Sequence, residues 1–487
     1  MALPQWLTTI FVVVEYVMKI IAIGVVPENR RPSSSSAWLL LILFVPVIGF
    51  PLYWLIGSPW VRGRRQKIQE QSDEVIKRHT EGLPLVPEGA HASPALERIL
   101  HMNRDLTSMP CMTGEVLGMH GEAAETYSSM AEAVDRALRY VHVEFYIMAW
   151  DDTTDVFFQA LARAVERGVK VRLLVDQLGS QKYPGWKKFQ RRLTEAGIEW
   201  RLMMPISLLR GRWRRPDLRN HRKLMIIDGD TGFMGSHNVI DPHYANKKNL
   251  RIGRQWHDLS ITVSGDIVLE LEAVFAMDWY VESGELLDPN EHFIDKPDRI
   301  PGGAANAMQL VPSGPGYPTE PNHRMFVALM YLAKDTITIA SPYFVPDEPL
   351  LNAITSAVYR GVHVELYVGA EADQFVVGHA QRSYYEALLE AGVQIYLYPA
   401  PAVLHSKYMT VDDSVGVIGS SNMDYRSFAL DYEIMLLGFG GNLVDLLHAN
   451  DEHYRGVSHL LTLEEWRGQP WWGRYLDNVC RLTSALM

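Results

Sequence analysis

Two stretches of the chain repeat the same four polar residue types at the same spacing. In each, a histidine is followed by a lysine two residues later, an aspartate seven residues later and an asparagine seventeen residues later: His221, Lys223, Asp228 and Asn238, then His405, Lys407, Asp412 and Asn422. Average residue usage gives on the order of a few per cent chance of one such histidine, lysine and aspartate match in a chain of this length. Two matches with identical spacing therefore indicate a duplicated functional unit.

The histidine and lysine of each stretch suit phosphoryl transfer. Both stretches are apolar and rich in β-branched residues, and side chains two positions apart lie on the same face of a strand. We therefore expect His221 and Lys223 to point into one cleft, and His405 and Lys407 likewise. In such a cleft an imidazole can attack or donate a proton, while an ammonium group holds a non-bridging phosphate oxygen.

The other polar residues of the two stretches are expected to support these pairs. Asp228 and Asp412 stand at odd offsets from the histidines, so we interpret them as strand-end residues with an orienting or structural role. Small residues and an asparagine follow, where a backbone can approach a ligand closely. These residues are Gly235, Ser236 and Asn238 in the first stretch, and Gly419, Ser420 and Asn422 in the second.

Length and composition describe a folded protein of more than one domain. The chain has 487 residues, of which 47% are hydrophobic, and a net charge of -11. This length favours two globular units with extra segments, and the acidic balance argues against a dedicated nucleic-acid binder. The two cysteines, Cys111 and Cys480, make a disulfide framework improbable and fit a reducing compartment.

The first 60 residues are expected to form a membrane hairpin of two transmembrane helices. Residues 37–57 carry no charge over a length that can span a bilayer, and residues 6–26 form a second, weaker candidate with two charges. Pro46, Gly49 and Pro51 predict a kink and not a break in the second helix. The alternative is that the segment lies in the membrane interface.

Basic residues predict the orientation of this hairpin. More of them follow the second segment than occupy the connecting loop: Arg62, Arg64, Arg65 and Lys67 against Arg30 and Arg31. The positive-inside rule then places both ends of the hairpin, and the large C-terminal part, in the cytoplasm. Residues 61–120 read as a helical stalk and a proline-rich linker.

Two further regions, residues 121–295 and 296–487, recapitulate each other as α/β domains. The first predicts strand, helix, strand, helix and strand at residues 140–150, 154–167, 169–176, 187–196 and 198–204. The second predicts the same order at residues 336–345, 350–360, 362–368, 384–391 and 393–398. Such alternation implies helices layered on a central sheet.

Residues 205–219 form a loop with five arginines, which is either a solvated loop or a clamp for anionic headgroups.

The duplicated His-x-Lys-x4-Asp motif resembles the signature of the phospholipase D superfamily. Within it, the chain is similar to the bacterial cardiolipin synthases over essentially its whole length. Four phrases and the hairpin carry this resemblance: Asn220-His221-Arg222-Lys223, SPYFVPD at residues 341–347, VPSGP at 311–315 and GSSNMDYRSF at 419–428.

The resemblance implies duplicated phospholipase D-like α/β/α sandwich domains in a pseudo-twofold arrangement behind the hairpin. It implies that two phosphatidylglycerol molecules become cardiolipin and glycerol through a phosphohistidine intermediate. His221 is then the nucleophile and His405 the general acid and base, although motif symmetry leaves the reverse assignment open. No metal or cofactor is implied, because two lysines and two asparagines supply the charge and dipoles that a divalent ion provides elsewhere.

The resemblance also places the chain in the bacterial cytoplasmic (inner) membrane. Its implied partners are phosphatidylglycerol, other anionic phospholipids and the membrane, with no nucleic acid. Whether phosphatidylethanolamine replaces one phosphatidylglycerol is open, and so is the oligomeric state, a homo-oligomer included. Three alternative functions are a membrane-bound phospholipase D that transfers to water, a nuclease and an inactive membrane scaffold. The acidic balance and the hairpin disfavour the nuclease, and the intact motifs disfavour the scaffold.

Members of this family also hold each histidine with a carboxylate downstream of the motif. Asp258 and Glu433 occupy those positions here and are expected to fix the tautomer of the imidazole. They lie 20 and 11 residues after the motif asparagines, which predicts an insertion near residues 246–254. The first half reads Gly-Ser-His-Asn where the family often has Gly-Gly-x-Asn, so the roles of Ser236 and His237 stay open.

Overall fold

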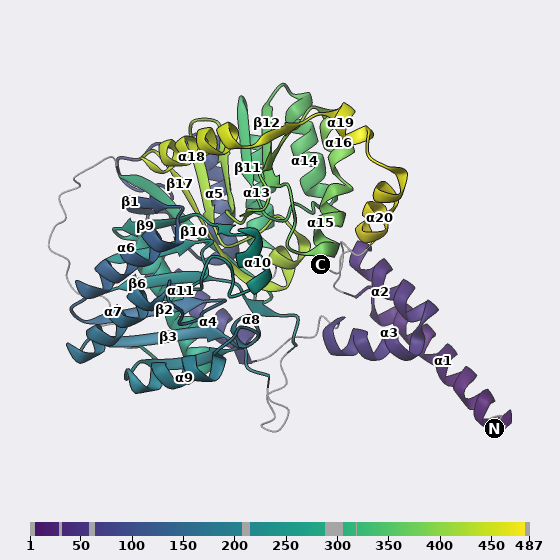
Figure 1. Cartoon of the computed structure of the whole chain (residues 1–487), viewed down its shortest axis with the longest axis horizontal. Helices are drawn as coiled ribbons and strands as arrows, with labels where there is room; N and C mark the ends of the chain where they lie inside the picture. The colour runs from purple at the N-terminus through teal and green to yellow at the C-terminus, as the bar shows by residue number, and fades with distance from the viewer. Residues whose placement is uncertain are drawn as a thin grey trace.

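A computed structural model describes residues 5–28, 32–57, 64–206, 215–287, 305–317 and 319–482 of the chain. Figure 1 shows two α/β halves joined side by side, with the N-terminal helices projecting from one end of the molecule's longest axis. The predicted α/β class and the predicted duplication are both present in the arrangement of the strands.

One continuous sheet runs through both halves, which meet where β1 (Met112–His120) pairs antiparallel with β10 (Asn306–Ser313). Outward from β1 the first-half strands are β9 (Ser260–Ser264), β7 (Thr231–Gly235), β6 (Lys223–Ile227), β2 (Tyr140–Phe145), β3 (Lys170–Asp176) and β4 (Glu199–Met203). Outward from β10 they are β17 (Asp431–Phe439), β16 (Val415–Gly419), β15 (Tyr408–Val411), β11 (Thr336–Ala340), β12 (His363–Gly369), β13 (Gln394–Tyr398) and β18 (His459–Leu461). Up to β4 and β13, each strand has a counterpart at the same place in the other half.

Helices cover both faces of this sheet. Because side chains alternate along a strand, Met225 and Ile227 of β6 pack with the helices of one face, while Leu224 and Ile226 pack with α11 on the other. The first face carries α6 (Ala123–Asp135), α7 (Asp155–Glu166) and α9 (Trp186–Glu195), with counterparts α13 (Pro321–Leu332), α14 (Glu348–Tyr359) and α16 (Tyr385–Ala391). The opposite face carries α11 (Ile267–Ser283) and α18 (Leu443–Val457).

The repeated strands and helices lie within two residues of their predicted bounds, apart from two strands that end early. Strand β2 ends at Phe145 and β11 at Ala340, five residues before the predicted ends in both cases. Beyond these points the chain keeps only isolated bridges, of Met148 with Val239 and of Phe344 with Met423. Residues 146–150 and 341–345 extend the apolar pattern of these two strands in the sequence. Most of them are buried next to the motif loops, although they do not belong to the sheet.

The segment expected to be a helical stalk and linker contains the expected helix, but over residues 64–120 it packs into the body of the protein. Strand β1 is central to the sheet, α5 (Pro94–Thr107) packs against α13, and α4 (Arg64–Thr80) packs along α11. Arg65 of α4 is buried, forms an ion pair with Asp278 and lies with its guanidinium carbon 4.1 Å from the centroid of the Tyr432 ring. In the sequence, the polar composition of α4 is typical of a solvated helix. The acidic residues that pair with Arg65 lie more than 200 residues further along the chain, so the sequence did not indicate its burial.

The N-terminal segment folds into α1 (Gln5–Val25), α2 (Pro32–Phe44), α3 (Pro46–Leu52) and a π-helical turn, η1 (Tyr53–Gly57). The predicted kink in the second helix is a break at Val45, with φ -135° and ψ 65°, since a residue before proline is driven out of the helical region. No helix among the described residues combines the length and the apolar run needed to cross a membrane.

We expect Arg65→Met to lower the free energy of unfolding by about 3 kcal/mol, because it leaves buried acidic groups without their partner. Denaturant unfolding of the full chain measures this difference. Arg78→Met is the matched control on the same helix, since the Arg78–Glu74 pair is exposed and should change stability by less than about 0.5 kcal/mol. Equal effects of the two substitutions would show that α4 is not anchored through Arg65.

Candidate active site

Two very short strands carry the chain of each half across to the other half just before its motif histidine. Strand β5 (Arg219–Asn220) pairs parallel with β17 of the second half and ends one residue before His221. Strand β14 (Val403–Leu404) pairs parallel with β8 (Trp256–His257) of the first half and ends one residue before His405. These crossings bring both histidines to the junction of the halves.

The main-chain N–H and the Nδ1 atom of His221 are both held by residues of the second half. Its main-chain N–H donates to the carbonyl of Tyr432 at 2.8 Å, and its ring nitrogen Nδ1 lies 2.8 Å from Oε1 of Glu433, the next residue. The ring of Tyr146 stands edge-on to the imidazole, with 5.0 Å between ring centroids. Since Nδ1 is engaged by the carboxylate, Nε2 is the nitrogen left for chemistry.

His405 is fixed in the same way by the first half. Its N–H donates to the carbonyl of His257 at 2.8 Å, and Nδ1 lies 2.5 Å from Oδ1 of Asp258. The two predicted carboxylates therefore do hold the two histidines, but each serves the histidine of the other half. Spacing along the chain could not show this exchange, because it follows from the parallel pairing of β5 with β17 and of β14 with β8.

The motif serines orient these carboxylates. Ser420 donates to Oε2 of Glu433 at 2.5 Å, and Ser236 donates to Oδ1 of Asp258 at 2.7 Å. Each hydroxyl also accepts from the main-chain N–H of the residue after the carboxylate. The sequence suggested that these serines lie at a ligand surface. Both are instead fully buried and stand behind the histidines.

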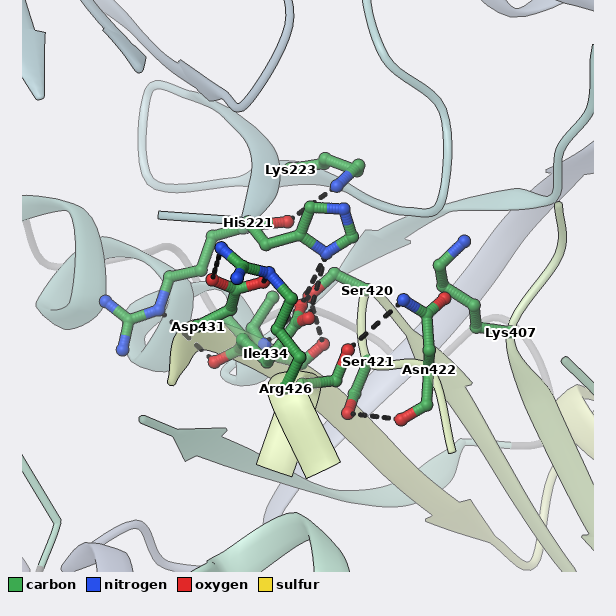
Figure 2. A network of polar contacts seen from close by, with 12 residues as sticks. His221, Lys223, Lys407, Ser420, Ser421, Asn422, Arg426, Asp431 and Ile434 are labelled. Atoms are coloured by element: carbon green, nitrogen blue, oxygen red, sulfur yellow. Dashed lines mark hydrogen bonds and ion pairs between the residues drawn. The ribbon is translucent and has the colours of Figure 1, made fainter. Parts of the chain in front are cut away.

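The two lysines lie beside the histidines at the same junction. Nζ of Lys223 donates to the carbonyl of His221, and Nζ of Lys407 to that of His405, both at 2.6 Å. Figure 2 shows Lys223 next to His221, with Lys407 and Asn422 alongside. Burial lowers the pKa of Lys223 to about 7 and that of Lys407 to about 8. Both lysines are fully buried next to the histidines, and of these four ionisable groups only the two histidines line the cavity described below.

The motif aspartates face away from this cleft and close turns at strand ends. Asp228 accepts from the main-chain N–H groups of residues 138–140, and Asp412 from those of residues 334–336. Both have a positive φ, 54° and 49°, a region that aspartate tolerates better than most residues. Their geometry agrees with the structural role expected for them.

The remaining motif residues line or underlie the cleft. Asn238 accepts from the N–H of Ile147 at 3.2 Å and donates to the hydroxyl of Tyr244 at 2.8 Å. Asn422 donates to Ser427 at 3.2 Å, while its buried Oδ1 has no hydrogen-bond partner among the residues that the structure describes. His237 is a packed histidine, since it is buried with its ring nitrogens next to Ser260 and Thr126, and burial lowers its pKa to about 4.

The two histidine–carboxylate pairs differ electrostatically. Burial raises the pKa of Glu433 to about 7, although the nearby lysines oppose this. Burial also opposes ionisation of Asp258, but attraction to His405 and their hydrogen bond outweigh it and hold the pKa of Asp258 far below its usual range. Burial and then Lys223 lower the pKa of His221 well below its ordinary value. His405 therefore has the more firmly ionised partner.

A cavity of about 430 Å³ opens over both histidines. It is lined by residues of both halves: Tyr146, Ile147, Lys182, Tyr183, His221, Asn238, Tyr244, Asn246, Lys248, Asn249, Arg254, Trp256, Tyr343, Asp373, Gln374 and His405. Several come from the predicted insertion, which forms α10 (Lys247–Ile252). The spacing of the motifs does not identify the residues that line the cavity. The predicted insertion near residues 246–254 does indicate those between Tyr244 and Trp256.

Of the arginine-rich loop, for which the sequence left a solvated loop and a clamp for anionic headgroups both open, the structure describes Arg215 and Arg219. Arg219 is buried with Nη1 3.4 Å from Asp176, and Arg215 pairs with Asp217. Arg210, Arg212 and Arg214 lie outside the described residues. Over the described parts of the chain, no cluster of three or more histidine, cysteine, aspartate or glutamate side chains is placed to hold a metal ion.

The fold and the paired site define the chain as a two-domain protein of the phospholipase D type. The crystal structure of a phosphatidylserine synthase from Haemophilus influenzae superposes with a TM-score of 0.58 at 15% identity, covering 81% of this chain and 100% of that one. This likeness supports the fold, with its duplicated α/β domains.

The matching family model is "Cardiolipin synthase, PLD-like domain", over residues 130–279 and 326–452, and "Phospholipase_D-nuclease N-terminal" matches residues 9–58. The cardiolipin synthase of Geobacillus kaustophilus is 32% identical, with 96% of this chain and 91% of that protein covered. Cardiolipin synthase A of Proteus mirabilis is 30% identical, with 94% of each covered. The chain belongs to the cardiolipin synthase family.

The exchanged pairing predicts which histidine each carboxylate substitution perturbs. Burial and Lys407 already lower the pKa of His405. We expect Asp258→Asn to lower it further, because a negative partner is lost, and Glu433→Gln to change the titration of His221. Nitrogen-15 NMR of histidine-labelled protein measures both, with resonances assigned from His→Gln variants. Each substitution should also slow turnover roughly 10²-fold.

Asp413→Asn is the control for this experiment, because Asp413 is 99% exposed and lies next to a motif aspartate. It should leave the titration of both site histidines unchanged. A change at His221 in Asp258→Asn, with His405 unaffected, would contradict the exchanged pairing.

Proposed function

We propose that the chain is a cardiolipin synthase that transfers a phosphatidyl group from one phosphatidylglycerol to another and releases glycerol. The relatives named cardiolipin synthase match it over nearly its whole length. The observation that carries the proposal is the convergence of His221 and His405 on one cavity, each with Nδ1 on a carboxylate. Two imidazoles with free Nε2 atoms and two lysines suit a double displacement at phosphorus.

In the first step, Nε2 of His221 attacks the phosphorus of one phosphatidylglycerol and forms a nitrogen–phosphorus bond. The bond from phosphorus to the headgroup oxygen breaks, and His405 donates its Nε2 proton to that oxygen, so free glycerol leaves. Lys223 and Lys407 stabilise the negative charge on the phosphoryl oxygens. The product of this step is a phosphatidyl group held covalently on His221.

In the second step, His405 takes a proton from a headgroup hydroxyl of the second phosphatidylglycerol. The resulting oxygen nucleophile attacks phosphorus, the bond to His221 breaks and cardiolipin forms. Both histidines return to their starting protonation states. Attack by water in place of the lipid hydroxyl would make the same site a phospholipase D, which is the alternative function.

The assignment of His221 as nucleophile is supported by the difference between the two carboxylates. A nucleophile must be neutral, and burial together with two lysines disfavours the cation of His221. A general acid must carry a proton, and although burial and Lys407 lower the pKa of His405, the ionised Asp258 opposes this and favours a proton on that imidazole.

The N-terminal segment supports a membrane location. The family match over residues 9–58 and the exposed apolar residues of α1 fit an anchor in the bacterial cytoplasmic membrane, with the α/β body in the cytoplasm. A membrane anchor keeps the cavity near its lipid substrates.

Purified full-length protein in mixed micelles with phosphatidylglycerol should form cardiolipin and release glycerol in equal amounts. Mass spectrometry of the lipids and an enzymatic glycerol assay measure the two products. The rate should be unchanged by EDTA, because lysines and asparagines supply the polarising groups. Phosphatidic acid as the main product would establish the hydrolase instead.

Substitution of either histidine should lower the rate by at least about 10⁴-fold, since the two act as one unit. The two variants differ in what accumulates. His405→Ala should retain phosphatidyl on His221 after exposure to phosphatidylglycerol with a labelled phosphate, while His221→Ala should retain none. Label trapped on His405 in His221→Ala would reverse the division of roles.

The rate should depend on pH with a bell-shaped profile whose alkaline limb is complete by about pH 9, because loss of the His405 proton and loss of the lysine charges both lower the rate. Each lysine carries its charge below its pKa and loses it above, and these pKa values are about 7 and about 8. The acid limb should lie below the ordinary histidine value because the pKa of His221 is lowered. Single-turnover measurements across pH test this, and activity that rises steadily to pH 10 would contradict it.

A further inference from the structure

Exposed apolar side chains gather on both sides of the cavity that holds the two histidines. On the first-half side, α10 follows Asn246, a lining residue, and on the second-half side α15 (Phe375–Arg382) begins directly after Gln374, another lining residue. The exposed apolar residues are Leu250, Ile252, Phe375 and Val376, of which Leu250 and Phe375 are each 65% exposed. The two short helices thus form apolar lips around one opening.

Helix α20 (Trp471–Arg481) extends the second-half lip. It packs on α15 through buried Asp477, which lies 2.6 Å from Nδ1 of His379 and 3.4 Å from Nε of Arg382. This contact turns the opposite face of α20 outward. That face exposes Trp471, Trp472, Tyr475 and Val479, the last three at a spacing close to one helical turn.

The same lips carry exposed basic residues. They are Lys247, Lys248 and Arg251 on α10 and Arg474 on α20. None of these four side chains forms an ion pair with another residue in the described parts of the chain. Lys182 also lines the cavity, whose one lining carboxylate among the described residues is Asp373, so basic groups outnumber acidic ones at this rim in a chain with a net charge of -11.

We propose that these residues of α10, α15 and α20, here called the lip surface, dock the body of the protein on an anionic phospholipid bilayer. The occupant is the bilayer surface itself, with tryptophan and tyrosine rings at the headgroup level and lysine and arginine at lipid phosphates. The cavity then opens directly onto the membrane. This inference deepens the proposed function, on which it rests, because it states how lipid substrates enter the site.

Two observations favour a bilayer over another protein. The lip surface is continuous with the walls of the cavity, so a protein seated on it would cover the entrance. The N-terminal helices, with their exposed apolar residues, project toward the same end of the molecule as α20 (Figure 1). A flat surface that contacts both regions suits a membrane.

Fluorophore quenching tests the docking without requiring activity. Leu250→Cys and Trp472→Cys, each labelled with bimane in the full-length protein reconstituted into phosphatidylglycerol-rich vesicles, should be quenched by lipids with nitroxide on the acyl chain. Leu138→Cys is the matched control, because Leu138 is also exposed but precedes β2, at the end of the strand away from the cavity. The two native cysteines, Cys111 and Cys480, are buried.

Quenching at residues 250 and 472 and none at residue 138 is the expected result. Equal quenching at all three positions, or none at 250 and 472, would overturn the proposal. Dipolar coupling between spin labels on residue 472 of two copies, without lipid quenching, would mark a contact between copies and would also overturn it.

A kinetic test separates docking from chemistry. The double variant Leu250→Ser, Trp472→Ser should lower synthesis from vesicle phosphatidylglycerol about tenfold, yet change turnover of short-chain, monomeric phosphatidylglycerol by less than about twofold. An equal loss on both substrates would overturn the docking role. If the unmodified protein forms no cardiolipin from either substrate, the proposed function fails, while the quenching result still decides the lip surface.

Discussion

The hydrogen bond between each motif histidine and a carboxylate of the other half is the contact on which the site depends. It is prepared by main-chain pairing, since the N–H of each histidine donates to the carbonyl that directly precedes the carboxylate residue. A histidine held at both its backbone and its ring cannot turn its reactive nitrogen away from the cavity. Neither half can assemble a working imidazole alone, which gives a physical reason why the two halves share one continuous sheet.

Burial of these charged groups strengthens their attraction to a substrate phosphate, but it also requires that each charge have a partner. Two lysines, two histidines and two carboxylates lie in a region of low polarity, where an unpaired charge would cost several kcal/mol. The lysine ammonium groups donate to the histidine carbonyls, and the serines donate to the carboxylates, so these charges have partners before any lipid arrives. The same low polarity strengthens attraction to a phosphate. Preorganised charge of this kind is what a phosphoryl-transfer site needs.

Near-symmetric motifs do not produce a symmetric site. The carboxylate that serves His221 is a glutamate whose ionisation burial disfavours, whereas the aspartate that serves His405 is held ionised. The halves also differ at the cavity wall, where the first contributes α10 and the second the start of α15. This difference supports the proposed roles, in which His221 attacks as the neutral imidazole and His405 carries the proton.

The sequence by itself determined the duplicated α/β pattern, the residue types of the site and the family, because periodicity and motif spacing are local properties of the chain. Asp228 and Asp412 behaved as predicted, since a turn at a strand end is also local. The exchange of Asp258 and Glu433, the burial of Arg65 and the role of β1 were decided only by the tertiary structure. Each depends on which distant segment becomes a neighbour, and pairing between remote strands leaves no periodic trace in the sequence.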